Sequence, residues 1–199
     1  MNFIQEYFKE AQQIMNQLDC SGLEKIVALI AEIRSQGGRI FFLGVGGSAA
    51  NASHAVNDFR KICGIECYTP TDNVSELTAR INDEGWDSAY VQWLQVSRLN
   101  SKDMLFIFSV GGGNVEKKIS TNLVKALAYG KQVHAKICGV VGPNGGATAQ
   151  MADVCVKIPA ARRESVTPHT EAFQAVIWHC MVSHPKLKMN EMKWESTLK

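Results

Sequence analysis

The residues best suited to chemistry form a glycine-rich loop that directly follows a run of apolar residues. Ile40 to Leu43, together with Val45, are typical of a buried strand. Gly44, Gly46 and Gly47 then allow a tight turn, because glycine adopts positive φ without steric cost, and Ser48 occupies the N-cap position of a helix. Unpaired backbone N–H groups and the helix dipole favour an anion at such a turn, most often phosphate.

Two common phosphate motifs do not fit this loop. It has no Gly-Lys-Ser/Thr of a Walker A loop, and it lacks the third glycine of the dinucleotide fingerprint. A plain strand-to-helix turn also explains the same residues. The loop alone therefore leaves both interpretations open.

The elements that must position this loop alternate along the chain. Further short apolar strands are predicted at 66–69, at 104–108, within 133–141 and at 154–158. Two helices are predicted before the first strand, over 2–20 and 22–36, and two more within 74–98, with a break near 82–85. A further helix should follow residues 109–114 and end at about 129, and a short one should follow 142–146. The last helix should begin with an N-cap at Thr167 and run towards Pro185. This alternation is typical of an α/β protein with a parallel sheet covered on both faces.

A second glycine-rich loop, residues 109–114, follows the 104–108 strand. Ligands of open parallel sheets bind beyond the carboxyl ends of the strands. Because both loops follow strands, we expect both to lie at such ends.

Composition narrows the class of protein. The chain has 199 residues, of which 46% are hydrophobic and 20% charged, as expected for one globular domain. The net charge of +2 argues against nucleic acid as a partner. No apolar run is long enough for a membrane span, and the first residues lack the pattern of a signal peptide, so we expect a cytoplasmic protein that does not bind a membrane.

The six cysteines do not predict a metal knuckle or a disulfide framework. Cys63 and Cys67 form the one close pair, without a second pair to complete a zinc site. Cys138 and Cys155 fall within predicted strands, where a thiol behaves as a small hydrophobic group. We therefore expect the cysteines to be reduced.

Several segments together resemble the sugar isomerase (SIS) domain family, and more narrowly the phosphoheptose isomerases. The matching segments are residues 44–54, Gly-Val-Gly-Gly-Ser-Ala-Ala-Asn-Ala-Ser-His, then 82–85, then 142–146 followed by Ala152-Asp153, and finally His179. The resemblance implies a five-stranded parallel sheet in a three-layer αβα sandwich, here as a single SIS domain over residues 1–199. Residues 1–37 would form an N-terminal helical extension, and 186–199 a polar tail.

The resemblance also implies a metal centre. The family holds Zn²⁺ with a helical His-x-x-x-Glu pair and with a Gln that lies eight residues before a His of the last helix. These positions carry His54, Asp58, Glu171 and His179 in this chain. One Zn²⁺ or a similar divalent ion per subunit is the expected cofactor, since both replacements still offer oxygen ligands. Glu171 and His179 are about 12 Å apart along a helix axis, so a compact site needs side chains that lean together or ligands from two subunits.

The implied reaction is an aldose–ketose isomerisation of a sugar phosphate through an enediolate, most directly sedoheptulose 7-phosphate to heptose 7-phosphate. Such a reaction needs a base, an acid and stabilisation of negative charge. We expect Asp58 and His179 to be the catalytic pair. The expected contacts to the substrate come from Val45, Gly46, Gly47, Ser48, Asn82, Asp83, Ser109, Val110, Gly111, Asn114 and Glu171.

The phosphate loop departs from the family pattern. The family has Ser-Thr-Ser-Gly-Asn-Ser after the third strand, whereas this chain has Ser109-Val-Gly-Gly-Gly-Asn114, and Val45 replaces an asparagine of the first loop. We expect anion binding to persist through Ser48, Ser109 and the amides of both loops. The alternative function is a non-catalytic SIS protein that binds a phosphosugar or a protein partner, as the replication-initiator-binding relatives do.

Two further expectations concern surfaces. The apolar stripe of the 2–20 helix needs a partner, and the resemblance implies a homo-oligomer, a tetramer, in which this helix lies at an interface. His169 lies outside the family pattern, and we expect it on the surface.

Overall fold

The computed structural model describes residues 2–197, and its sheet matches the sequence-based expectation. The sheet has five parallel strands in the order β2-β1-β3-β4-β5. The strands are β1 (Ile40–Leu43), β2 (Cys67–Tyr68), β3 (Met104–Ser109), β4 (Lys136–Val141) and β5 (Val154–Lys157). The fold class, an α/β sandwich with a parallel sheet, is thus confirmed.

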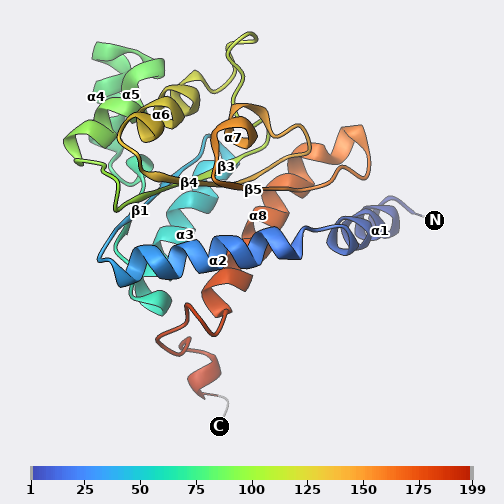
Figure 1. Cartoon of the computed structure of the whole chain (residues 1–199). Coiled ribbons are helices and arrows are strands. Elements are labelled where there is room, and N and C mark those ends of the chain that lie inside the picture. The colour runs from blue at the N-terminus through green and yellow to red at the C-terminus, as the bar shows by residue number, and fades with distance from the viewer. Residues whose placement is uncertain (1, 198–199) are drawn as a thin grey trace.

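Helices cover both faces of this sheet (Figure 1). The helices are α1 (Phe3–Asn16), α2 (Cys20–Ser35), α3 (Gly47–Cys63), α4 (Val74–Glu84), α5 (Trp86–Val96), α6 (Thr121–Gln132), α7 (Gly146–Met151) and α8 (Val166–Ser183). Helices α2, α3 and α8 lie on one face, and α4 to α7 lie on the other. None of these helices, within residues 2–197, has the length and apolar character needed to cross a bilayer.

Alternation along each strand creates two separate cores. Phe42 and Phe106 face α3 and α8, whereas Phe41 and Ile107 face α5 and α6. All four side chains are completely buried. Because both faces are covered, the strands carry continuous apolar runs rather than a polar–apolar alternation.

Several element boundaries differ from the sequence-based expectations. The N-cap of α8 is Ser165, two residues before the predicted Thr167. Helix α6 begins at Thr121, so the second glycine-rich loop is followed by an irregular segment in which Asn114 and Ile119 form an isolated bridge. The first residues of the predicted polar tail pack against the domain, because Leu187 is completely buried and the Met189 N–H donates to the Ile62 carbonyl. Residues 198–199 of this tail lie outside the described part of the chain.

The prediction that His169 lies on the surface is wrong. Its side chain is buried where α1 meets the start of α8, and its ring stacks on Tyr7 with 4.2 Å between centroids. The His169 Nε2 lies 3.0 Å from Glu10 Oε2, and the Ser165 hydroxyl donates to the same oxygen at 2.7 Å. Arg162 Nε pairs with Glu10 Oε1 at 2.5 Å. The contact between Glu10 and His169 could not be predicted from local sequence patterns, because the two residues are 159 positions apart.

We expect Glu10 to make the folded state sensitive to acid. The hydrogen bond from Ser165 lowers the pKa of Glu10 below its ordinary value of 4.5, and the hydrogen bond with His169 and the charge of Arg162 lower it further. A lowered pKa stabilises the fold above pH 4.5, and this contribution is lost as the pH falls through the folded-state pKa. Glu10→Gln should therefore lower the urea midpoint at pH 7, and its difference from wild type should shrink below about pH 4. An equal difference at pH 7 and pH 3 would contradict this role.

Candidate metal centre between helices α3 and α8

Helices α3 and α8 pack side by side and run in the same direction. Paired contacts lie along their length: Asn51 with Gln174, His54 with Trp178, and Cys63 with Val182. Small and apolar residues of both helices, including Ala52, Ala55 and Ile177, are buried between them and the sheet. This packing fixes the outward-facing residues of each helix relative to those of the other.

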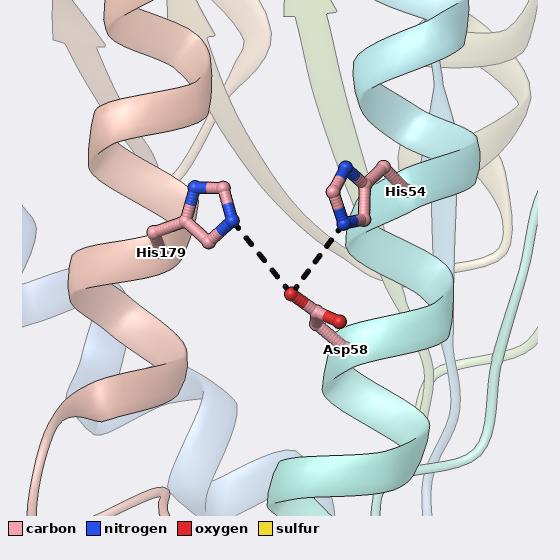
Figure 2. Close-up of side chains that lie close together, drawn as sticks. All are labelled: His54, Asp58 and His179. Carbon is pink, nitrogen blue, oxygen red and sulfur yellow. Dashed lines mark ion pairs between the residues drawn. The ribbon is translucent and has the colours of Figure 1, made fainter. Parts of the chain in front are cut away.

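Three of the four predicted metal ligands meet on this helix pair. His54 and Asp58 lie one turn apart on α3, and His179 faces them from α8 (Figure 2). The Nε2 atoms of both histidines are 3.8 Å from the same oxygen, Asp58 Oδ2. All three ligand atoms lie within 4.8 Å of one another.

Neighbouring groups orient these ligand atoms. The His179 Nδ1 lies 2.8 Å from the Ala175 carbonyl, so Nδ1 carries the proton and Nε2 keeps its lone pair towards Asp58. The Asn57 amide donates to Asp58 Oδ1 at 2.7 Å, which leaves Oδ2 for the cluster. The His54 ring packs on the buried Trp178, with 4.6 Å between centroids. Sequence reasoning identified the three ligands but missed Asn57, Ala175 and Trp178.

The donor set fits a divalent metal ion. At 3.8 Å the nitrogen–oxygen separations are too long for hydrogen bonds. Ligands at about 2.1 Å in a tetrahedral shell are about 3.4 Å apart, so the three atoms must move closer together to bind one ion, and the fourth position stays open. Two neutral imidazoles and one carboxylate suit Zn²⁺, and three protein ligands are typical of catalytic zinc sites that keep an open position.

Glu171, the fourth predicted ligand, does not join this cluster. Its carboxylate lies against the amino end of α3, where a Cβ placed on Gly47 would be 2.5 Å from Glu171 Oε2. The reason is the helical rise, since eight residues separate Glu171 and His179 by about 12 Å along α8. The backbone carbonyl of Glu171 accepts a hydrogen bond from the Asn51 side-chain amide at 2.9 Å.

The first glycine-rich loop has the predicted turn. Gly46 adopts φ of 63°, and the chain enters α3 at Gly47. Ser48 is buried, and its hydroxyl has no hydrogen-bond partner among the described residues. Val45 is partly buried against the core on the α5 side of the sheet, and the Tyr90 hydroxyl donates to the Gly44 carbonyl at 2.6 Å.

The second-loop residues that we expect to contact the substrate do not all line the same cavity. The buried Ser109 hydroxyl accepts a hydrogen bond from the Gly112 N–H at 2.9 Å. Val110 and Gly111 line a cavity at the carboxyl ends of β3 and β4. Asn114 lines a different, smaller cavity with Gly146 and Gln150, and its side chain accepts from the Lys117 N–H.

Asn82 and Asp83 lie at the exposed end of α4. There the Asn82 amide donates to Asp83 Oδ1 at 2.8 Å. Neither residue belongs to the cluster of His54, Asp58 and His179, and their contact with the substrate stays a prediction.

The metal cluster opens into a cavity of about 650 Å³. Asp58 and His179 form part of its lining, and Lys61 follows them on α3. Ile62 and residues 191–196 of the C-terminal segment, including the exposed Trp194, complete the lining. A small-molecule substrate can therefore reach the ligand atoms from solvent.

The chain matches a family model described as "SIS domain" over residues 6–142. A phosphoheptose isomerase of Aneurinibacillus thermoaerophilus is 30% identical over 162 residues, which cover 79% of this chain and 76% of that protein. The lincomycin biosynthesis protein LmbN of Streptomyces lincolnensis is 32% identical over 159 residues, and the match spans 74% of this chain but 56% of LmbN.

Solved structures show the same fold. The phosphoheptose isomerase GmhA of Neisseria gonorrhoeae superposes with a TM-score of 0.78 at 22% identity, over 90% of this chain and 95% of that one. Together, fold and relatives define the class of this protein as a sugar phosphate isomerase. The chain belongs to the SIS domain family and, within it, to the phosphoheptose isomerases.

Proposed function

We propose that this protein is a metal-dependent aldose–ketose isomerase that converts sedoheptulose 7-phosphate to a heptose 7-phosphate. The observation that carries the proposal is the convergence of His54, Asp58 and His179 beside a cavity large enough for a sugar phosphate. Two imidazoles and one carboxylate oxygen supply the metal ligands that this reaction needs, and the second oxygen of Asp58 remains for proton transfer.

In the proposed reaction, a proton moves between C1 and C2 of the sugar through an enediolate. The Asp58 carboxylate takes the proton from carbon through Oδ1, the oxygen that does not face the histidines, and returns it to the neighbouring carbon. The sugar oxygens exchange their proton with water, because His179 Nδ1 donates to the Ala175 carbonyl and its Nε2 is the proposed ligand atom. His54, held against Trp178, keeps its Nε2 towards Asp58. When bound by His54, Asp58 and His179, Zn²⁺ would supply a Lewis acid that stabilises negative charge on oxygen.

A panel of ketose phosphates, followed by NMR in the presence of zinc, tests the proposed function. We expect aldose formation with sedoheptulose 7-phosphate and less or none with shorter sugars. No turnover with any member would favour the alternative, a non-catalytic SIS protein that binds a phosphosugar or a protein partner.

The departure at the phosphate loop leads to a specific prediction. Nothing lies within 4 Å of a Cβ placed on Gly111, and Val110 borders the same cavity, so both positions have room for hydroxyls. The double variant Val110→Thr, Gly111→Ser should lower KM for the sugar phosphate about tenfold or more, because a hydrogen bond to a charged group contributes about 1.5–3 kcal/mol. Steady-state kinetics checks this, with the unphosphorylated ketose as control. An unchanged KM would mean that this loop does not contact phosphate.

We also propose a homo-oligomer, a tetramer, in which α1 lies at an interface. Phe3, Ile4 and Phe8 expose more than 60% of their surface on this helix, which extends beyond the sheet (Figure 1). Exposed apolar side chains on one helix are typical of a surface that another subunit covers. Sedimentation at micromolar concentration should give a species several times the 21.9 kDa of one chain; a stable monomer would contradict the assembly.

A further inference from the structure

The C-terminal segment, residues 186–197, turns the exposed metal cluster into a cavity. It follows α8 and lies beyond the carboxyl ends of α3 and α8 (Figure 1). The side chains of His54 and His179 are 57% and 49% exposed, so α3 and α8 alone would present the cluster on an open surface. Residues 191–196 line the cavity of about 650 Å³ together with Asp58 and His179. The segment therefore supplies much of the wall of this cavity.

The beginning of this segment is fixed to the domain, whereas its end is held weakly. Leu187 is completely buried, and its carbonyl accepts a hydrogen bond from Arg34 at 2.7 Å. The Asn190 side-chain amide donates to the Lys61 carbonyl at 2.8 Å. Beyond Asn190, the hydrogen bonds among the described residues connect the segment only to itself, and Met192 packs against the core. Such a segment opens locally at a low cost in free energy.

The lining of the cavity combines charges of both signs with an exposed aromatic ring. Lys61 and Lys193 provide hydrogen-bond donors, whereas Glu191 and Glu195 provide acceptors. Because a hydroxyl group both donates and accepts, this mixture suits a ligand with many hydroxyls. Trp194 exposes 80% of its surface and lines the same cavity. An indole can pack on the C–H groups of a sugar while its N–H donates to a hydroxyl.

We propose that Trp194 is a substrate-binding residue, whose indole packs on the carbon chain of the sugar at the metal cluster. The inference rests on the proposed function for the identity of the ligand as a sugar phosphate. Trp194 and the ligand atoms of Asp58 and His179 border one cavity, so a single sugar contacts both. Closure of the weakly held residues 191–197 over the sugar would also exclude water from the reacting carbons.

The test measures binding of sedoheptulose 7-phosphate to the full chain with zinc restored. Calorimetry should show that Trp194→Ala weakens binding about tenfold, as expected when about 60 Å² of apolar surface is no longer buried. Trp194→Phe should recover most of the affinity, because it keeps an aromatic face. The sugar should also protect Trp194 from acrylamide. The excess fluorescence quenching of wild type over Trp194→Phe should therefore disappear at saturating sugar.

Met189→Ala is the matched control. Met189 is an exposed apolar residue of the same segment, but its side chain does not line the cavity. It should change the affinity less than twofold. The proposal is overturned if Trp194→Ala binds the sugar as wild type does, if Met189→Ala loses as much affinity, or if the sugar leaves the quenching of Trp194 unchanged.

Zinc content separates a binding role of Trp194 from a structural one. Trp194→Ala should keep as much zinc per chain after dialysis as wild type, because it removes no ligand; a loss of zinc would reject the binding role. The substrate panel separates this inference from the proposed function. Trp194-dependent binding without turnover would support the binding residue and reject the isomerase. Turnover with unchanged affinity in Trp194→Ala would support the isomerase and reject the binding residue, and absence of both binding and turnover would reject both.

Discussion

Replacing His179 with alanine should remove both the metal and the activity. His179 Nε2 is one of three ligand atoms grouped within 4.8 Å, and its Nδ1 is already committed to the Ala175 carbonyl. Two remaining ligands bind a divalent ion far more weakly than three, and the Lewis acid that the proposed reaction needs is lost with the metal. We expect turnover to fall about 10²–10⁴-fold, because a Lewis acid supplies several kcal/mol of transition-state stabilisation.

The measurement is zinc per chain after dialysis, by elemental analysis, together with the rate of aldose formation. Cys180→Ala is the matched control, because Cys180 is the next residue of α8 and is also exposed. It should keep the metal and the rate of wild type. Full zinc retention in His179→Ala, or an equal loss in Cys180→Ala, would remove His179 from the proposed centre.

Trp178→Ala should have the largest effect on stability. Trp178 is completely buried in the core between α3, α8 and the sheet, and the His54 ring packs on it. Truncating a buried aromatic side chain to alanine costs about 3–5 kcal/mol through lost burial and the resulting cavity. Because the indole also supports His54, zinc retention should fall together with the free energy of unfolding.

The Trp178→Phe variant tests whether stability depends on a packed aromatic ring or on the indole N–H of Trp178. The indole Nε1 is buried without a hydrogen-bond partner among the described residues, so the phenyl ring removes no hydrogen bond. We expect urea unfolding to show a loss below about 1.5 kcal/mol for phenylalanine, the usual size for a swap that keeps most of the hydrophobic volume. Equal losses for phenylalanine and alanine would mean that the site does not depend on a packed ring.

The sheet was predictable because its signals are local. Each strand is a short apolar run. The glycine-rich loops that begin at Gly44 and at Ser109 mark the ends of β1 and β3. The same holds for His54 and Asp58, which a single turn of α3 places on one face. His179 was predictable only through the family resemblance, since a different helix carries it.

Features that depend on packing between distant segments were not predictable. The spacing along α8 already predicted the distance of Glu171 from His179, but only the pairing of α8 with α3 places the Glu171 carboxylate against Gly47. His169 was expected on the surface, but α1 folds over it and supplies Glu10 as its partner. Neither periodicity nor spacing along one helix encodes which neighbour will cover a side chain.

The most direct test of metal-dependent isomerisation is deuterium exchange into sedoheptulose 7-phosphate in D₂O, followed by proton NMR. The same protein sample is measured zinc-free, after zinc is restored, and beside Asp58→Asn with zinc restored. The account predicts deuterium at the carbon next to the carbonyl, with aldose formation, only in the zinc-restored wild type. Equal exchange by the zinc-free protein, or by Asp58→Asn, would contradict it.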